Sequence, residues 1–454
     1  MTGRYWLEHA WLGGHASAPT VDAVLVSVED GRFTRVEPGV TEVPADAQRL
    51  SGLTVPGMAN CHSHAFHRAL RGHTQRERGT FWTWREQMYA VAERLTPDTC
   101  YDLARATYRE MLAAGFTAVG EFHYLHHGPE GTPYDDPNAM GVALVEAARD
   151  AGIRIALLDT CYLASGIGSP PEGVQRRFAD GDADAWAARV ERLRHLTDDR
   201  TVVGAAIHSV RAVPRDQMPT VAAWARAHAV PLHVHLSEQV AENRACLEHY
   251  GETPTGVLEE AGALGERSTA VHATHLTDAD VRLLGETRTH ACLCPTTERD
   301  LADGIGPSRL LHDAGSPLTL GSDSHAVVDA FEEMRAVELD ERLDSQERGR
   351  WSAGELLHAA TSVGHASLGF DDAGRIAVGA RADLVTLDPC SPRTGGTPIG
   401  PEAAVFAASA ADVVAVVVDG RRVTGRDEHA DIGHDLARAV EALGLATAPV
   451  KEQP

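Results

Sequence analysis

Histidine and aspartate side chains recur in short motifs that could bind a metal ion. The motif His62-Ser63-His64 places two imidazoles two residues apart, and positions i and i+2 of a β-strand lie on one face. Further along the chain, His235 stands near the end of the apolar run 231–236, and Asp323 follows the run 318–321. Three imidazoles and one carboxylate form a ligand set that suits Zn²⁺ and leaves a position for water. A lone His-x-His pair is weak evidence for a metal site. The case for such a site therefore depends on whether the secondary-structure elements bring the four residues together.

Each of these side chains stands where a predicted β-strand ends. From about residue 55 to 370, short apolar runs alternate with amphipathic segments, which is typical of successive βα units. Eight such units predict a (β/α)₈ TIM barrel, in which the C-terminal strand ends line one active site. We therefore expect the four ligands to converge on one metal ion. The predicted strands span residues 55–62, 117–124, 154–162, 202–208, 231–236, 269–273, 289–294 and 318–321.

The two ends of the chain carry a different pattern. Residues 1–54 and 380–425 hold alternating strand signals with Asp-Gly turns at Asp30-Gly31 and Asp419-Gly420. We expect the ends to pair into one small β-sandwich domain, with residues 1–54 as its N-terminal part and residues 380–454 as its C-terminal part. A terminal helix is predicted over residues 428–445, and the hydrolase barrel over residues 55–379.

Two further strand-end residues are predicted to be catalytic. Glu238 lies three residues after His235 at the start of a predicted helix, so its side chain can reach back toward the metal. The alternative is a carboxylate that only stabilises the helix N-terminus. His272 ends the sixth predicted strand and could orient an attacking water by a hydrogen bond. We expect Asp323 to act both as a ligand and as the acceptor of a proton from water.

Composition narrows the classes of function. The chain has 41 basic and 65 acidic residues, a formal net charge of −24, which argues against nucleic acid or an anionic membrane as partner. No apolar run is long enough to span a bilayer, no signal peptide is recognisable, and the seven cysteines form no CxxC pair, so we expect a cytoplasmic protein. Lys451 is the one lysine, which excludes a Schiff base, a P-loop lysine or a Ser-Lys pair.

Taken together, these motifs resemble the mononuclear deaminase branch of the amidohydrolase superfamily. The resemblance rests on the His-x-His pair, His235 with Glu238, His272, Asp323 and the closing segment 374–385, and it covers nearly the whole chain. The lack of an internal lysine agrees with it, because the binuclear branch bridges its metals with a carbamylated lysine. The resemblance implies one divalent metal, Zn²⁺ or another ion such as Fe²⁺, and a homodimer.

Finer motifs resemble the formimidoylglutamate deiminases, which act in histidine degradation. These motifs are residues 81–89, 121–127 and 207–213. In that family the positions of Arg85, Tyr124, His208 and Arg211 hold the carboxylates of N-formimino-L-glutamate, which is converted to N-formyl-L-glutamate and ammonia. Where the family has a glutamine near the substrate, this chain has His67.

A small dianionic substrate agrees with the arginines on physical grounds. The planar guanidinium binds a carboxylate by two parallel hydrogen bonds, and local arginines must overcome the negative charge of the whole chain. Three alternatives remain: a superfamily deaminase of purine, pyrimidine or triazine rings, a non-catalytic scaffold of the same fold, and a serine hydrolase. The last is disfavoured because the chain has no GxSxG motif. We interpret His123, His126 and His127 as structural.

Overall fold

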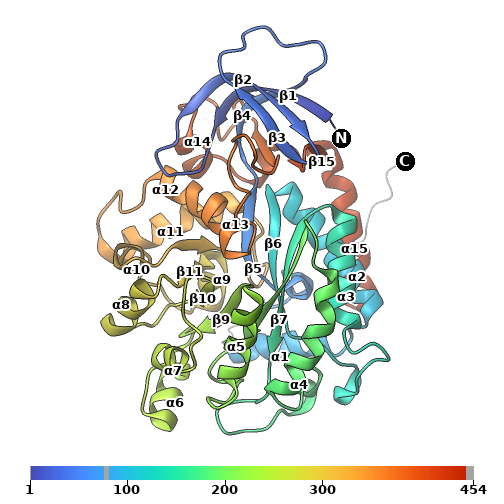
Figure 1. Cartoon of the computed structure of the whole chain (residues 1–454), viewed down its shortest axis with the longest axis vertical. Helices are drawn as coiled ribbons and strands as arrows, with labels where there is room; N and C mark the ends of the chain where they lie inside the picture. Colours follow the sequence, from blue (N-terminus) through green and yellow to red (C-terminus); the bar gives the residue numbers. More distant parts are fainter. Residues whose placement is uncertain (1, 76–80, 446–454) are drawn as a thin grey trace.

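The computed structural model describes residues 2–75 and 81–445 of the chain. Two bodies are visible, a barrel and a smaller β domain stacked on one of its ends (Figure 1). Lys451 lies outside the described residues. Among the described residues, no helix combines the length and the apolar character that a membrane crossing requires.

Eight parallel strands form the barrel, in sequence order around the sheet. Every residue of β6 and β7 is buried, because helices cover the outer face and packed side chains fill the inner one. The first and last strands meet at a bridge between Ser63 and Asp323, where the Asp323 amide donates to the His62 carbonyl at 3.0 Å. The predicted barrel is confirmed. Its strands are β5 (Met58–Ser63), β6 (Phe116–His123), β7 (Arg154–Cys161), β8 (Thr201–Ile207), β9 (Leu232–Leu236), β10 (Ser268–His272), β11 (His290–Leu293) and β12 (Leu318–Leu320).

Helices surround the barrel, and several of them begin at a residue whose side chain caps the helix. Thr96 caps α2 with a reciprocal side-chain bond to Thr99, and Pro97 occupies the first helical position, where its missing N–H costs nothing. Thr277 and Asp280 form the same arrangement at α8. The helices are α1 (Phe81–Ala92), α2 (Pro97–Ala113), α3 (Ala139–Ala151), α4 (Ala183–Glu191), α5 (Met218–His228), α6 (Val240–Tyr250), α7 (Pro254–Glu260), α8 (Asp278–Glu286), α9 (Pro295–Leu301), α10 (Ser308–Ala314), α11 (Ala330–Ser345), α12 (Ala353–His358) and α13 (Gly364–Ser367).

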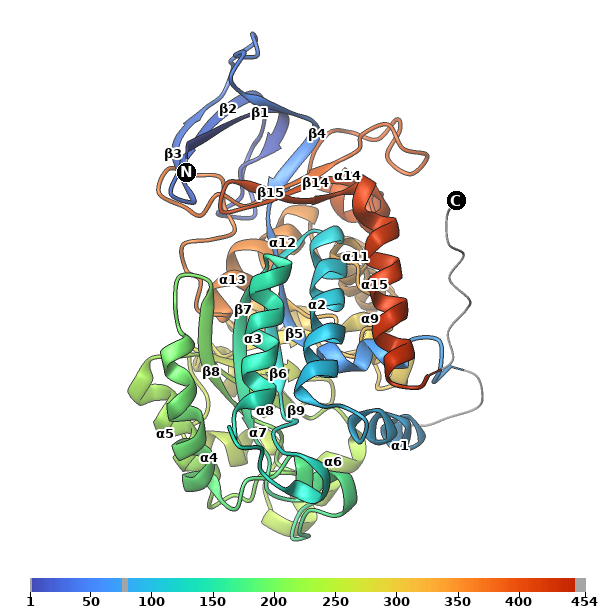
Figure 2. The same cartoon turned by 90° about the vertical axis from the view of Figure 1, so that its right-hand side faces the viewer.

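Both ends of the chain build the β domain, as predicted. Its strands form one mixed seven-stranded sheet in the order β15-β14-β13-β4-β1-β2-β3, rather than two separately bonded sheets. The strands are β1 (Thr2–Trp11), β2 (Thr20–Glu29), β3 (Arg32–Glu37), β4 (Gln48–Pro56), β13 (Leu384–Leu387), β14 (Val413–Val418) and β15 (Arg421–Gly425). The short helix α14 (Pro401–Phe406) precedes β14, and the terminal helix α15 (His429–Ala442) packs along α2 (Figure 2).

Gly57 marks the passage from one sheet to the other. The sequence predicts one strand over residues 55–62, but β4 ends at Pro56, where it still pairs with Leu384 of the β domain, and β5 begins at Met58. A Cβ at Gly57 would lie 2.2 Å from Thr117 Oγ1, so only glycine fits this junction. β4 thus reaches past the predicted domain border at residues 54 and 55.

A buried ion network joins the β domain to the N-terminal ends of the barrel strands. Arg154, the first residue of β7, pairs with Asp383 and Asp419 of the β domain, and its side chain is fully buried. In TIM barrels this end contributes to stability, whereas the C-terminal strand ends carry the site. The β domain therefore lies away from the predicted ligands.

Candidate active site

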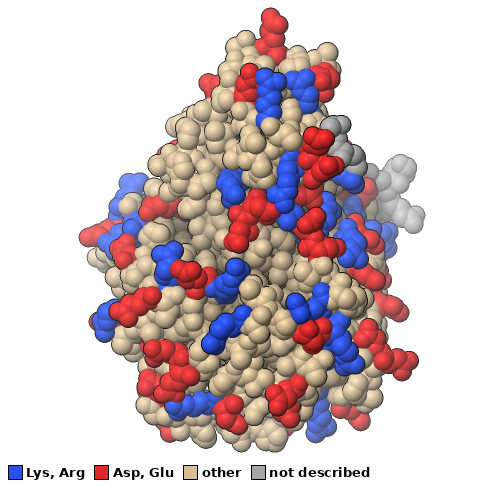
Figure 3. All heavy atoms as spheres, in the orientation of Figure 1, with Lys and Arg blue, Asp and Glu red and all other residues tan. Residues whose placement is uncertain are grey.

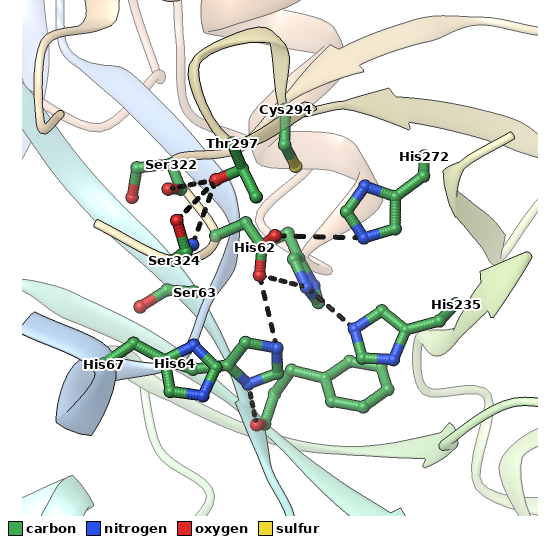
Figure 4. Close-up of polar contacts among 12 residues, drawn as sticks. His62, Ser63, His64, His67, His235, His272, Cys294, Thr297, Ser322 and Ser324 are labelled. Atoms are coloured by element: carbon green, nitrogen blue, oxygen red, sulfur yellow. Dashed lines mark hydrogen bonds and ion pairs between the residues drawn. The ribbon is translucent and has the colours of Figure 1, made fainter. Parts of the chain in front are cut away.

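The four predicted metal ligands meet at the C-terminal ends of the barrel strands. Figure 4 shows the three histidines among them, His62, His64 and His235, turned toward one another. His62 lies in β5 and His64 directly follows it, His235 lies in β9, and Asp323 follows β12. All four are buried, and their ligand atoms lie within 4.8 Å of one another. His62 Nε2 lies 3.0 Å from His235 Nε2 and 3.3 Å from Asp323 Oδ1, and His64 Nε2 lies 3.4 Å from the same oxygen.

These separations fit a divalent metal. Ligand atoms at about 2.0–2.1 Å from a tetrahedral Zn²⁺ lie about 3.3 Å apart, close to the distances found here. The Nδ1 of His64 lies 2.8 Å from the Phe122 carbonyl, which fixes the proton on Nδ1 and leaves the Nε2 lone pair facing the centre. Burial lowers the pKa of His62, and it lowers the pKa of His64 to about 3, which favours the neutral imidazole that binds metals.

Asp323 supplies the negative charge of the centre. Burial opposes ionisation, yet the neighbouring imidazoles, chiefly that of His62, hold the pKa of Asp323 well below its ordinary value. Its backbone has a φ of 40°, a left-handed value that few non-glycine residues adopt. The carboxylate is thus ionised and held in an unusual orientation by its surroundings.

The two predicted catalytic residues lie beside the ligands. His272 ends β10, and its Nε2 is 3.8 Å from Asp323 Oδ2 and 3.9 Å from Glu238 Oε1. On the other edge of the ring, Nδ1 lies 3.4 Å from Oε1 of the buried Glu298. Burial lowers the pKa of His272, but Glu238, Glu298 and Asp323 outweigh it and raise the pKa to about 10. Sequence reasoning missed Glu298, whose signal was a carboxylate in the first turn after a strand end.

A cavity of about 370 Å³ opens over the metal ligands. Its volume suits a small metabolite. The predicted substrate residues His67, Arg85, Tyr124, His208 and Arg211 all line this cavity, together with His64, His235, Glu238, His272 and Asp323. The structure therefore brings the predicted binding residues and the predicted metal centre into one pocket.

Arg211 is held by two carboxylates, one in the loop between β9 and α6 and one in the first turn of α6. Its Nη2 lies 3.2 Å from Glu238 Oε2, and its Nε lies 3.2 Å from Glu242 Oε2. Burial raises the pKa of Glu242 to about 7 although Arg211 opposes the shift. Glu242 was not predicted from the sequence. Its spacing of four residues from Glu238 was the available signal, since such residues share a face of a helix.

Arg85 is held differently, by aromatic rings of its own helix. Its guanidinium lies 4.4 Å from the centre of the Trp82 ring and 5.5 Å from that of Tyr89. Among the residues that the structure describes, no carboxylate forms an ion pair with Arg85. Stacking on ring faces leaves the N–H edges of a guanidinium available to a ligand. The positive charge of Arg85 is therefore the less compensated of the two.

His67 and Tyr124 form a hydrogen-bonded pair on the cavity wall. His67 Nε2 lies 2.8 Å from the Tyr124 hydroxyl, and the His208 ring centre lies 5.5 Å from that of Tyr124. Burial lowers the pKa of His67 and of His208 well below the ordinary value, so both are neutral hydrogen-bonding groups. His67 thus lines the cavity and is held there by its contact with Tyr124.

A second group of buried histidines lies beside a carboxylate that is already paired with an arginine. His123 and His126 lie near Asp159, but Arg189 donates to both oxygens of Asp159, at 2.7 and 2.9 Å. The Trp186 indole N–H also donates to this carboxylate, at 3.0 Å. The guanidinium already compensates the charge of Asp159, which agrees with a structural role for these histidines.

Comparison with known proteins identifies the family to which this chain belongs. The profile of the amidohydrolase family matches residues 53–423, more than half of the chain. The chain belongs to the amidohydrolase family. It is 37% identical to the formimidoylglutamate deiminase of Pseudomonas aeruginosa over 91% of this chain and 94% of that protein. It is also 30% identical to the 8-oxoguanine deaminase of the same organism over 90% and 92% of the two chains.

The fold comparison agrees with this amidohydrolase assignment. The crystal structure of an amidohydrolase from Brucella melitensis superposes with a TM-score of 0.89 at 31% identity, covering 98% of this chain and 100% of that one. The predicted superfamily and the predicted class of enzyme, a hydrolytic deaminase, are therefore confirmed.

Proposed function

We propose that this amidohydrolase hydrolyses N-formimino-L-glutamate to N-formyl-L-glutamate and ammonia, a step of histidine degradation. The observation that carries the proposal is the polarity of the pocket. Arg85 and Arg211 line the cavity together with the carboxylates of Glu238 and Asp323; Arg211 is paired with Glu238, and Asp323 belongs to the ligand cluster. The proposed substrate has matching poles, because its formimidoyl group is a cationic amidine and its two carboxylates are anionic.

The residues present would hold one divalent ion, for which Zn²⁺ is the proposed identity. When bound, this ion supplies a Lewis acid and lowers the pKa of a coordinated water to about 7. Asp323 lies where it can take a proton from the attacking water, and His272 Nε2 can orient that water by a hydrogen bond. Water adds to the formimidoyl carbon, and the nitrogen that leaves takes up a proton.

Glu238 is placed to move that proton. Its Oε1 faces His272, and its Oε2 is paired with Arg211, so it lies between the metal ligands and the carboxylate-binding end. A carboxylate here can pair with the cationic amidine, take up a proton that the attacking water gives up, and pass it to the nitrogen that leaves as ammonia, a step worth typically about 10²–10⁴-fold in rate.

The carboxylate-binding end fixes the rest of the substrate. We assign its two carboxylates to Arg85 and Arg211, with Tyr124 and His208 as further hydrogen-bond partners. His67 supports this wall through its contact with Tyr124. The homodimer and the cytoplasmic location stay predictions from the sequence.

A deaminase of a purine or another heterocycle is the second candidate, favoured by the likeness to 8-oxoguanine deaminase. The experiment that separates the two is ammonia release by the zinc-loaded protein from N-formimino-L-glutamate, N-formimino-L-aspartate, 8-oxoguanine, guanine and cytosine. We expect release from the glutamate derivative, weaker release from the shorter aspartate derivative, and none from the heterocycles. Release from a heterocycle alone would overturn the proposal, and a protein that retains no metal would support the scaffold alternative.

A further inference from the structure

We infer that Ser63, Glu121 and His325 form a hydrogen-bonded chain of positioning residues that holds the His-x-His ligands of β5 in register with Asp323. None of the three belongs to the ligand set or lines the cavity. The inference concerns retention of the metal and does not depend on the identity of the substrate.

Ser63 stands between the two ligands of β5 but faces away from them. Adjacent residues of a strand point to opposite faces, so the Ser63 side chain leaves the side on which His62 and His64 act. Figure 4 shows Ser63 directed away from the imidazoles of His62, His235 and His272. The Ser63 hydroxyl is fully buried, donates to Glu121 Oε2 at 2.8 Å, and lies 3.0 Å from His325 Nε2.

Glu121 holds the residues on both sides of His64, Ser63 through its hydroxyl and Ala65 through its amide. One of its carboxylate oxygens accepts from the Ser63 hydroxyl, and the other accepts from the Ala65 amide at 2.7 Å. Ser63 and Ala65 are the two chain neighbours of His64, so a single buried carboxylate from β6 holds them both. The direction in which the His64 imidazole leaves the chain is set by these two contacts.

His325 extends the chain of hydrogen bonds to the segment that carries Asp323. Asp323 and His325 have φ values of 40° and 57°, which are costly for residues other than glycine and persist where neighbours hold them. The His325 ring is held by Ser63, and its carbonyl accepts from Arg71 Nε at 2.6 Å. The His325 end of this strained segment is thus held by two residues that do not bind the metal.

The consequence is preorganisation across the seam of the barrel. β5 and the segment after β12 meet at the Ser63–Asp323 bridge, and three of the four ligands lie on these two pieces of chain. The side-chain contact of Ser63 with His325 is a second link between β5 and the segment that follows β12. Partners that orient metal ligands in this way typically contribute about 10–100-fold to metal affinity.

The experiment is a zinc competition with Ser63→Ala. Zinc-loaded full-length enzyme is titrated with a chromogenic chelator, and the affinity for zinc is obtained from the released metal. We expect Ser63→Ala to lower zinc affinity about 10–100-fold. Glu121→Gln, whose amide oxygen retains part of the acceptor capacity, is expected to lower the affinity in the same direction and serves if Ser63→Ala does not fold.

A matched control is available elsewhere in the barrel. Ser308 is also buried, donates to a buried carboxylate, Glu341 Oε2, at 2.6 Å, and accepts from the Trp351 indole at 2.9 Å. Ser308→Ala should lower the urea midpoint about as much as Ser63→Ala and leave zinc affinity unchanged. Parent-like zinc affinity in Ser63→Ala and Glu121→Gln, or an equal loss in Ser308→Ala, would overturn the inference.

Discussion

Arg211 and one of its two carboxylate partners, Glu238, are predicted from the sequence, whereas the second partner, Glu242, is found only in the structure. The guanidinium is bracketed by Glu238 and Glu242, so part of its charge is already balanced before a ligand arrives. A substrate carboxylate must therefore share Arg211 with Glu238, and carboxylate recognition is physically linked to the proposed proton carrier. Arg85, stacked on Trp82, has no such competitor among the described residues.

The first prediction concerns Arg211→Met. Loss of the guanidinium removes charge-assisted hydrogen bonds worth about 1.5–3 kcal/mol each, so we expect KM for N-formimino-L-glutamate to rise about 10–100-fold. Bound metal should stay at the parent level, because Arg211 is not a ligand. Steady-state kinetics and metal analysis provide the two readouts. Arg215→Met, at an exposed ion pair with Glu260, is the control, and a parent-like KM in Arg211→Met would show that the carboxylate assignment is wrong.

The second prediction concerns Asp323→Asn. The amide keeps the size of the side chain but cannot accept the proton of water and binds a divalent cation poorly. We expect ammonia release to fall below detection and zinc retention on dialysis to decrease. Asp313→Asn, at an exposed position of α10, should behave like the parent. Measurable turnover in Asp323→Asn would remove this carboxylate from the mechanism.

At the level of elements, the strand ends matter more than the strands. The apolar runs of the sequence locate all eight barrel strands, because a parallel strand buried on both faces reads as a continuous apolar segment. The run 55–62 is different, since it contains Gly57, where the chain leaves one sheet for the other. Periodicity cannot show such a change of partner, because buried apolar residues such as Val55 and Met58 stand on both sides of Gly57.

This junction provides the third prediction, for Gly57→Ala. The added methyl group would meet Thr117 and Asp383, so overpacking should lower the free energy of unfolding by about 1–3 kcal/mol. Gly433→Ala in α15 has no atom within 4 Å of its new Cβ and should raise it by about 1 kcal/mol through helix propensity. Urea denaturation measures both. Equal stability of Gly57→Ala and the parent would show that the junction is not tightly packed.

The whole molecule depends on contacts between the barrel and the β domain. Arg154 is fully buried between Asp383 and Asp419, and its charge is compensated by residues far along the chain. On the outside, acidic and basic side chains are interspersed over the face shown in Figure 3 rather than gathered into one patch of a single sign. The excess of acid therefore does not take the form of a single acidic surface there.

The fourth prediction follows from the buried arginine. Arg154→Met leaves two carboxylates at the domain boundary without their cation, and breaking a buried ion pair costs about 3–5 kcal/mol. We expect the free energy of unfolding to fall by this amount, with the metal site retained in the folded protein. Arg149→Met, at a half-exposed pair with Asp198, should change stability by less than about 1 kcal/mol. Calorimetry compares the two variants.

The fifth prediction concerns acid. Burial lowers the pKa of His126 and of His365 to about 4, whereas an unfolded imidazole titrates near about 6.5. Between these two pKa values the unfolded chain binds more protons than the folded one. The contribution of the neutral imidazoles to the free energy of unfolding is therefore fully present above pH 6.5 and is lost as the pH drops toward 4. At pH 5, each group lowers the free energy of unfolding by about 2 kcal/mol. In His365→Gln the decrease in the free energy of unfolding between pH 7 and pH 5 should be smaller by that amount, as urea denaturation at the two pH values would show. An unchanged decrease would contradict the lowered pKa of His365.

The sequence by itself determined the barrel, and it located the four clustered residues predicted to bind the metal and the two flanking residues predicted to be catalytic. These follow from local facts: alternation along one strand, apolar runs in a repeating βα order, and side chains that stand where each strand ends. The tertiary structure alone decided which partners hold them, because Glu242, Glu298, Glu121 and His325 act through contacts that spacing does not encode. Ser63 and His325 are 262 residues apart, and Arg154 and Asp383 are 229 apart. Such pairs meet only when the barrel closes and the two chain ends join into one sheet.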